Sequence, residues 1–173
     1  ITHVAHVVAQ VPRDVTLRWA ALLHDVGKVP TFTQDETGRG HFYGHAKESA
    51  AMADQILRRL KASNELREQV VLLIEKHMLR PLAEKKFLRR QLSNLGWEAF
   101  YQLLSLQRAD MASKGVDEPR EDYSEIYRLL EEIKAENACL SLKDLAVNGR
   151  DLMNLGLKGR EVGQTLNRLL EEV

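Results

Sequence analysis

The chain has 173 residues, and its 25 basic and 25 acidic side chains give a formal net charge of zero. Its content of 44% hydrophobic and 29% charged residues excludes a disordered or collagen-like chain, and the balanced charge gives no overall field that would attract nucleic acid or a membrane. The single cysteine, Cys139, excludes an internal disulfide framework and any Cys-based zinc cluster, and no segment resembles a membrane span or a signal peptide. We therefore expect a cytoplasmic protein with no membrane partner.

The first residues already follow a helical period. Val4, Val7, Val8 and Val11 share one helical face, although the chain begins at Ile1 rather than at a methionine. Because a natural N-terminus seldom begins inside an amphipathic helix without a cap, we expect the sequence to be part of a longer protein.

Helical periodicity dominates the rest of the chain, and no segment shows a convincing strand pattern. After the first helix, which Pro12 closes, the pattern predicts helices over residues 14–25, 45–61, 63–78, 84–95, 97–113, 121–137, 150–155 and 160–173, a short piece at 143–145, and an irregular loop over 26–44. The predicted fold class is all-α, with a main helical bundle over residues 1–137 and a small helical C-terminal appendage over 138–173. The seam between them falls at Ala138–Ser141.

Several predicted helices end an apolar face with a titratable side chain. The stripe Leu17, Ala20, Ala21 leads to His24, with Asp25 beside it, and three further stripes carry His45, His77 and Asp110 at one end. Burying such groups without partners costs several kcal/mol each. Their convergence on one cation would remove most of that cost.

Each of these residues also has a simpler interpretation. A lone histidine on an apolar face is usually structural, and we place His6 in that class, as a supporting or core side chain. Asp25 alone fits a helix-end carboxylate, and Asp110 alone fits a backbone cap or a partner of Arg108. Taken together, however, imidazole and carboxylate groups without a thiolate predict a catalytic divalent ion, with Mn, Ni, Co, Fe, Zn and Mg all left open.

The same residues carry a resemblance to a known family. His3, the run Leu22–Lys28 that contains His24 and Asp25, and Arg108-Ala109-Asp110 resemble the HD superfamily of metal-dependent phosphohydrolases. The resemblance implies an HD-type bundle in which His3, His24, Asp25 and Asp110 ligate the metal. A histidine preceding this sequence is the alternative to His3.

A narrower resemblance comes from the loop and the tail. Pro30–Thr33, Gly40–His45, Asn148–Met153 and Leu155–Leu157 look like the HD domain and C-terminal segment of bacterial CCA-adding tRNA nucleotidyltransferases and related poly(A) polymerases. This implies a parent protein in which an N-terminal nucleotidyltransferase domain precedes the segment. No glycine-rich turn with paired aspartates occurs here, so we expect the polymerising site to lie outside this chain.

The resemblance implies a divalent-metal phosphohydrolase acting on a 2′,3′-cyclic phosphate, a 2′-nucleotide or another small phosphomonoester, with tRNA ends or small nucleotide phosphates as substrates. Lys28 is a candidate for neutralising charge on the phosphate, against the alternative of a solvated lysine. His45 and His77 are candidates for a second metal, for phosphate binding or for general acid catalysis, against structural roles. The competing functions are a catalytically silent RNA-binding body of a CCA-adding enzyme and a stand-alone nucleotidase.

Other charged and apolar segments leave alternatives open. The basic residues Lys85, Lys86, Arg89, Arg90, Arg58, Arg59 and Lys61 fit RNA contacts or, more simply, a solvated surface. Arg39 and His41 fit substrate contacts or a flexible solvated loop. The segment Gly156–Arg160 fits a phosphate site at a helix N-terminus or a tight turn. The final apolar stripe, which includes Val162 and Leu166, fits core packing or the seam of a homodimer.

Overall fold

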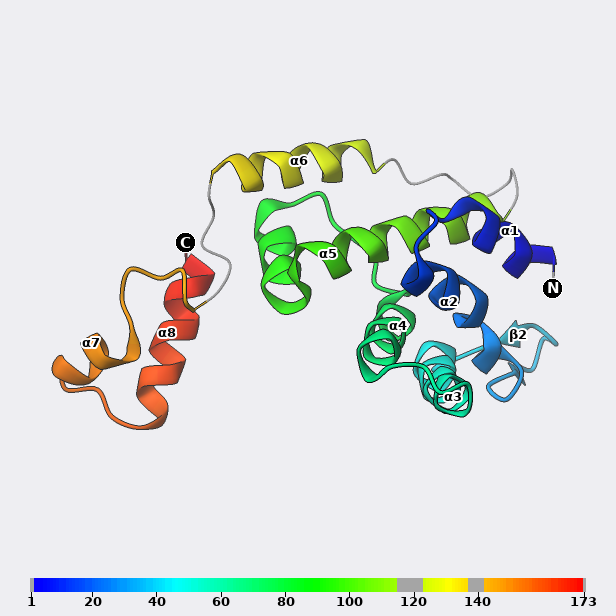
Figure 1. Cartoon of the computed structure of the whole chain (residues 1–173), viewed down its shortest axis with the longest axis horizontal. Helices are drawn as coiled ribbons and strands as arrows, with labels where there is room; N and C mark the ends of the chain where they lie inside the picture. The colour runs from blue at the N-terminus through cyan, green and yellow to red at the C-terminus, as the bar shows by residue number, and fades with distance from the viewer. Residues whose placement is uncertain (1, 115–122, 137–141, 173) are drawn as a thin grey trace. The chain divides into compact units, whose positions relative to one another are not determined.

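The computed structural model describes residues 2–114, 123–136 and 142–172 (Figure 1). The chain divides into two compact units, the first formed by Ile1–Arg80 and Glu98–Glu121 and the second by Pro81–Trp97 and Asp122–Val173. Helices dominate the described residues and only one two-stranded sheet occurs among them, which confirms the all-α class. None of the helices in these residues is long and apolar enough to cross a bilayer.

Unit 1 is a bundle whose helix boundaries follow the predicted ones closely. Its helices are α1 (Thr2–Gln10), α2 (Val15–Leu23), the short 3-10 helix η1 (Val26–Lys28), α3 (His45–Arg59), α4 (Asn64–Lys76) and the second part of α5 (Lys85–Ala112). The carboxylate of Asp14 accepts from the Leu17 amide at 2.7 Å and starts α2. The Ser63 hydroxyl caps α4 in the same way.

The long helix α5 contains the break that the sequence predicts between two shorter helices. Gly96 has φ 77° and ψ 166°, which lies outside the helical region and which a glycine adopts without strain. The predicted pair of helices over 84–95 and 97–113 is therefore found, joined at Gly96. The kink coincides with the division of the chain, because Trp97 belongs to unit 2 and Glu98 to unit 1.

The segment predicted as an irregular loop is more ordered than expected. It contains η1 and a small antiparallel hairpin of β1 (Thr33–Gln34) and β2 (Gly40–His41), in which Thr33 lies opposite His41. The turn of the hairpin is held by Asp35, whose carboxylate accepts from the Thr37 and Arg39 amides at 2.9 and 3.0 Å. These local hydrogen bonds do not follow a hydrophobic period, which is why periodicity alone missed the hairpin.

A close approach between η1 and α3 places both elements at the candidate site. The Gly27 amide donates to the Ser49 hydroxyl at 2.9 Å, and a Cβ at Gly27 would lie 2.5 Å from the Ser49 amide nitrogen and 2.7 Å from the His45 carbonyl oxygen. Only glycine fits this contact without a shift of backbone. The apolar core beneath it includes Ala20, Ala53, Leu57 and Leu73, all at most 2% exposed.

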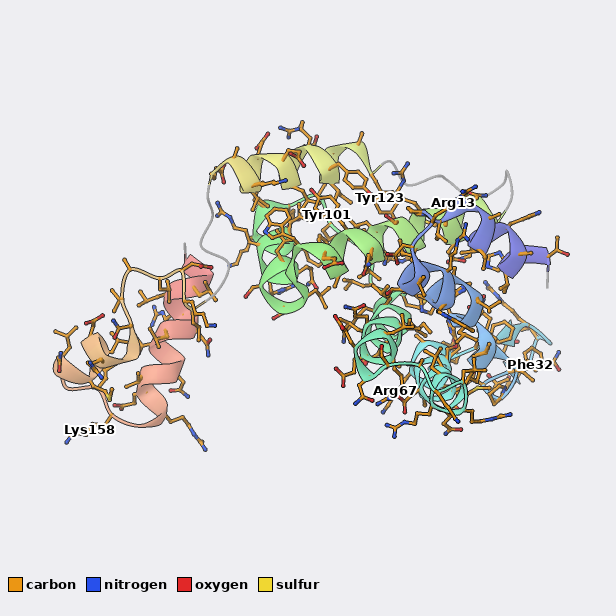
Figure 2. The ribbon with its side chains drawn as sticks, in the orientation of Figure 1. Arg13, Phe32, Arg67, Tyr101, Tyr123 and Lys158 are labelled. Carbon is orange, nitrogen blue, oxygen red and sulfur yellow. The ribbon has the colours of Figure 1, made fainter. Side chains whose placement is uncertain are left out.

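Unit 2 contains the first part of α5 together with α6 (Ser124–Ala135), α7 (Gly149–Asn154) and α8 (Arg160–Glu172). Residues 143–145 form turns, so the short helical piece predicted there is wrong. Lys158 lies in the turn that joins α7 to α8 (Figure 2), where Gly156 and Gly159 have positive φ. The predicted domain boundary at 137/138 and the seam Ala138–Ser141 lie outside the described residues, and that boundary stays a prediction.

Candidate metal centre

Three histidines of unit 1 are oriented by backbone carbonyls of the preceding turn. The Nδ1 atom of His24 lies 2.8 Å from the Ala21 carbonyl oxygen, and those of His45 and His77 lie 2.8 and 2.6 Å from the carbonyls of Phe42 and Ile74. Because a carbonyl oxygen only accepts, each Nδ1 must donate its proton. In the neutral imidazole, the lone pair then lies on Nε2, which is the arrangement that a metal ligand needs.

His3 reaches the same state through a serine on α5's C-terminal side. The Ser113 hydroxyl donates to the Asp110 carbonyl oxygen at 2.7 Å, and it lies 2.8 Å from His3 Nδ1. The hydroxyl therefore accepts the Nδ1 proton of His3, leaving a lone pair on Nε2. Ser113 was not identified from the sequence, because nothing in its position one turn after Asp110 distinguishes it from any helix-end serine.

Two carboxylates complete a compact set of donors with His3 and His24. Asp110 Oδ1 lies 3.0 Å from His3 Nε2 and 3.5 Å from His24 Nε2, and Asp25 Oδ2 lies 3.7 and 3.4 Å from the same two atoms. Ligand atoms about 2.1 Å from one ion and at right angles are roughly 3 Å apart, so each of these histidine–carboxylate separations is one that a single ion can span. Among the four residues, His3, His24 and Asp25 form a group whose ligand atoms all lie within 4.8 Å of one another. The donors fit a divalent cation.

Burial supports the same conclusion. In the part of the chain that the structure describes, His3 Nε2, His24 Nε2 and Asp110 Oδ1 are buried side-chain atoms without a hydrogen bond, and so is His45 Nε2. Such unmatched polar atoms are costly in a folded protein unless a ligand or ion satisfies them. Three of these atoms belong to the predicted ligand set and the fourth to His45; such atoms also occur outside the ligand set, at Arg67 Nε and Gln107 Oε1.

A second group of donors shares Asp25 with the first. Ligand atoms of Asp25, His45 and His77 lie within 4.8 Å of one another, as do those of His3, His24 and Asp25. His45 Nε2 is 3.7 Å from Asp25 Oδ1, the carboxylate oxygen that does not face His3 and His24. The main chain behind His77 is fixed by Gln107, whose amide donates to the His77 carbonyl at 3.0 Å.

Two lysines flank the carboxylates. Lys28 Nζ lies 2.7 Å from Asp25 Oδ2, and Lys114 Nζ lies 2.9 Å from Asp110 Oδ2. Both lysines are about one-third exposed, so their ammonium groups remain accessible from the solvent side. Lys28 was predicted from the motif. Lys114 was not predicted, although its spacing of four residues from Asp110 is the usual signal for a helical ion pair.

The charges of the site shift the pKa of several groups. Burial disfavours the charged form of His24, but the carboxylates of Asp110 and Asp25 outweigh it and raise the pKa of His24 to about 9. Although burial opposes ionisation, His24 and Lys28 hold the pKa of Asp25 well below its usual range, and His24 and Lys114 do the same for Asp110. Burial, with the nearby His24 and His45, lowers the pKa of His77 to about 4. Both carboxylates are therefore anionic and His77 is uncharged at neutral pH.

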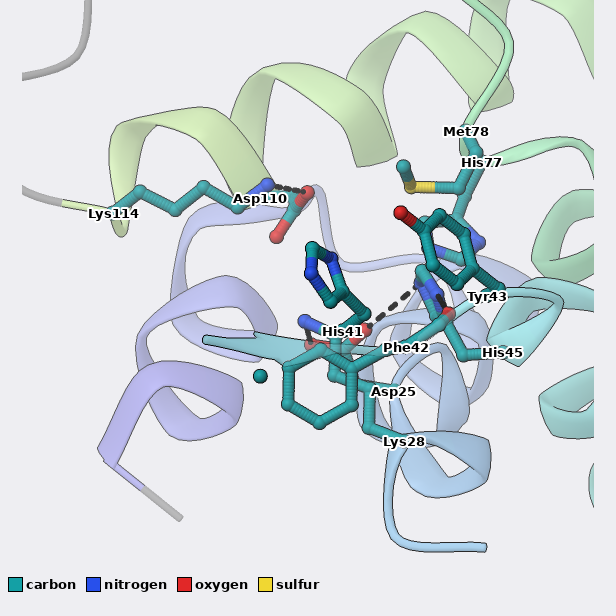
Figure 3. A pocket seen from close by; sticks show the side chains of 11 residues that line it. Asp25, Lys28, His41, Phe42, Tyr43, His45, His77, Met78, Asp110 and Lys114 are labelled. Carbon is teal, nitrogen blue, oxygen red and sulfur yellow. Dashed lines mark hydrogen bonds and ion pairs between the residues drawn. The ribbon is translucent and has the colours of Figure 1, made fainter. Parts of the chain in front are cut away.

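The carboxylates, the two lysines, His45 and His77 line a pocket in unit 1 with a volume of about 340 Å³ (Figure 3). Asp25 and Asp110 lie in its wall together with Lys28 and Lys114, and the hairpin and the residues that follow it contribute His41, Phe42 and Tyr43. This volume falls within the size range of pockets that hold small ligands. The two carboxylates are thus open to a small molecule rather than sealed inside the bundle.

All seven residues selected from the sequence lie in this one region: His3, His24, Asp25, Asp110, Lys28, His45 and His77. His6 is exposed, which excludes the core, one of the two positions expected for it. His41 lies in the pocket wall rather than in a flexible solvated loop, and Arg39 is not among the lining residues.

The comparison with family models identifies one family. The model described as HD domain matches residues 1–143 of this chain. The match therefore covers more than half of the sequence and includes every residue of the candidate metal centre. No solved structure matches the chain.

Curated relatives match most of the chain. It is 35% identical over 168 residues to the A-adding tRNA nucleotidyltransferase of Deinococcus radiodurans, covering 91% of this chain and 37% of that protein. It is 39% identical over 163 residues to the CC-adding tRNA nucleotidyltransferase of Thermus thermophilus, covering 89% and 35%. A shorter match, 38% identical over 89 residues, is to the multifunctional CCA protein of Aromatoleum aromaticum, covering 47% of this chain and 21% of that protein. The chain thus spans little more than a third of the first two relatives.

Proposed function

Because this chain belongs to the HD domain family, we propose that unit 1 binds a divalent metal ion and hydrolyses phosphate esters of nucleotides at or near tRNA ends. The proposed metal ligands are His3, His24, Asp25 and Asp110. The observation that carries the proposal is the convergence of buried imidazole Nε2 atoms on two ionised carboxylates.

The chemistry divides among the residues around the pocket. A divalent ion at this site supplies Lewis acidity, which activates water and polarises a phosphoryl oxygen. Lys28 and Lys114 bind the remaining phosphoryl oxygens and neutralise the charge that develops on them. His45 and His77 hold a second cation with Asp25 or contact the phosphate, and burial keeps His77 uncharged at neutral pH.

The substrate class rests on the relatives. Their names describe enzymes that add nucleotides to tRNA, so we infer that the ester lies on a tRNA end or on a nucleotide released from one. A 2′,3′-cyclic phosphate, a 2′-nucleotide and a small phosphomonoester are the three substrates to test. The relatives' greater length supports an N-terminal nucleotidyltransferase domain in the parent protein.

Metal analysis of the purified chain beside Asp25→Ala is the first test. We expect about one equivalent of Mn, Ni, Co, Fe, Zn or Mg in the wild type after incubation with the ion, and none in the variant, because Asp25 belongs to both donor groups. Hydrolysis of the three substrates is then compared among the wild type, His24→Ala and Asp110→Ala. Equal background rates in all three proteins, or no metal in the wild type, would overturn the proposed hydrolysis.

The second candidate is a tRNA-holding body without hydrolysis of its own. It is favoured by the fact that the relatives are tRNA nucleotidyltransferases of which this chain corresponds to about a third. Its signature is tight tRNA binding that His24→Ala and Asp110→Ala leave unchanged, together with an absence of ester hydrolysis. A homodimer through α8 stays a prediction; the half-buried Val162 lies against α7, since a Cβ at Gly149 would be 3.4 Å from Val162 Cγ1.

A further inference from the structure

Two aromatic rings stack at the rim of the pocket. The ring centroids of His41 and Tyr43 are 5.1 Å apart and their planes differ by 10°, so the rings are parallel. Tyr43 is nevertheless 76% exposed, which leaves most of its ring open to solvent. Both residues line the same pocket as Asp25 and Asp110 (Figure 3).

The His41 ring is held in place by the hairpin. Its Nε2 donates to the Asp35 carboxylate at 2.8 Å, and Asp35 also accepts from the amides of Thr37 and Arg39. The Phe32 ring covers Gly40, where a Cβ would lie 2.6 Å from Phe32 Cε2. A ring with its orientation fixed in this way offers a stacking surface at a low cost in conformational entropy.

The backbone at Tyr43 is fixed by its position directly before the candidate metal-site residues of α3. Gly44, which follows it, has φ 77° and turns the chain directly into α3, whose first residue is His45. On the other side, the Phe42 ring lies 5.7 Å from Lys28 Nζ, and Lys28 is paired with Asp25. The aromatic pair is thus fixed within two residues of a side chain that faces the carboxylates.

We infer that His41 and Tyr43 form a stacking platform for a nucleobase, so that the site selects nucleotides over phosphate esters that lack a base. This inference rests on the proposed function for the position of the phosphate. If Lys28, Lys114 and the cation hold the phosphate, the sugar and base of the nucleotide lie against the part of the pocket wall that the two rings form. Flat aromatic faces stack on unpaired bases of any sequence. An exposed tyrosine ring buries little apolar surface in the folded chain, so its exposure is better explained by stacking on a ligand.

The test compares ligands with and without a base on the complete, metal-loaded chain. Hydrolysis is measured with adenosine 2′,3′-cyclic phosphate and with ribose 2,3-cyclic phosphate, and binding is measured by the fluorescence quenching of 2-aminopurine riboside 2′-phosphate. The variants are Tyr43→Leu, which removes the π face, and Tyr43→Phe, which keeps it. Tyr127→Leu is the matched control, since Tyr127 lies in α6 and does not line the pocket.

We expect Tyr43→Leu to lower kcat/KM for the adenosine ester and affinity for the fluorescent nucleotide by roughly 5-fold to 100-fold. The base-free ester should be hydrolysed at the wild-type rate by this variant, and Tyr43→Phe should retain the preference for the base. Tyr127→Leu should behave as wild type throughout. A thermal melt of Tyr43→Leu that matches the wild type excludes a general loss of folding.

Equal losses for both esters, or no loss for either, would overturn the platform. If no protein hydrolyses any ester, the proposed hydrolysis fails, and the fluorescence titration alone decides the platform. A tRNA ending in a 2′,3′-cyclic phosphate provides the last arm. A Tyr43→Leu loss shared with the free nucleotide shows that the terminal base of the RNA uses the same platform, whereas wild-type hydrolysis of the tRNA by this variant restricts the platform to free nucleotides.

Discussion

The two units use charged side chains in opposite ways. In unit 2, Lys85 is about one-third exposed and pairs with Glu132 and Glu136 at 2.8 and 2.7 Å, and Arg89 pairs with Glu136 at 2.8 Å. In unit 1, His3 and His24 face carboxylates that are only about one-tenth exposed, and several polar atoms there have no hydrogen bond. Clustered basic residues on a surface are therefore weak evidence of function when neighbouring acids neutralise them. Buried polar atoms without a hydrogen bond are stronger evidence, because such atoms usually contact a ligand or an ion.

Removing one of the buried polar atoms of unit 1 that have no hydrogen bond is the most direct test of this difference between the units. His3→Ala should lower ester hydrolysis about 100-fold or more, because the proposed cation loses a ligand. His6→Ala is the matched control, since it removes an exposed histidine from the same helix and should change nothing. Metal content and initial rates are measured for both variants. Wild-type metal content in His3→Ala would show that His3 is not a ligand.

Replacing a glycine by alanine should have opposite effects on the stability of the two units. Gly27→Ala forces a methyl group against the backbone of α3 and should destabilise unit 1 by about 3 kcal/mol. Gly163→Ala, in the middle of α8 with no atom within 4 Å of the new methyl group, should stabilise its helix by about 0.5 to 1 kcal/mol. Urea unfolding monitors both, because Trp19 lies in unit 1 and Trp97 in unit 2. Equal stability of Gly27→Ala and the wild type would contradict the close approach.

The metal-free site should also make the stability of unit 1 depend on pH. The pKa of His24 is raised from 6.5 to about 9 in the folded chain, so the protonated ring contributes stability that is fully present below pH 6.5 and is lost as the pH rises through 9. The Tm of the metal-free chain should therefore fall by several degrees between pH 6.5 and 9, followed by Trp19 fluorescence in a Trp97→Phe background.

Two further measurements sharpen this prediction. A bound cation replaces the His24 proton, so the stabilisation that the ion provides should increase over the same pH range. His77 does not interfere, since its lowered pKa affects stability only below pH 6.5. A His24→Gln chain should lose the decrease in Tm between pH 6.5 and 9. A metal-free wild type whose Tm rises over this range would refute the assignment of the proton to His24.

The smallest effect is expected in unit 2. Lys85→Ala removes an exposed partner of Glu132 and Glu136, and exposed ion pairs contribute little to stability, so neither the Tm nor hydrolysis should change measurably. Lys28→Ala, the same substitution beside Asp25, should lower hydrolysis. A loss of tRNA affinity in Lys85→Ala, measured beside the wild type, would instead assign the basic residues of α5 a role in RNA contact.

Much of unit 1 could be predicted because its signals are local. Helix boundaries followed from caps such as Asp14 and Ser63 and from the break at Gly96. The candidate metal ligands could be recognised because titratable side chains lie at the ends of apolar helix faces. The position of His3 could not come from periodicity, since its partner Asp110 is distant along the chain. The family resemblance supplied it.

The remaining features depend on three-dimensional contacts that no periodicity records. The Asp35 turn converts a glycine-rich loop into a hairpin that carries His41 to the pocket. The pairing of Ser113 with His3 links residues at opposite ends of unit 1. The short piece expected at 143–145 failed for a simpler reason: three residues cannot gain enough hydrogen bonds to nucleate a helix without tertiary support.

The proximity of His3 and Asp110 brings two distant parts of the chain into contact at the candidate metal centre. The two side chains come within 3.0 Å across a separation of about a hundred residues, so an ion at the proposed site would act as a removable cross-link that closes residues 3–110 into a ring. A permanent cross-link over a loop of that length restricts the unfolded chain by about 4 to 5 kcal/mol on an entropic account. Metal supply would then govern the lifetime of the domain as well as its chemistry, and α1 would be the first helix exposed to proteases when the ion leaves.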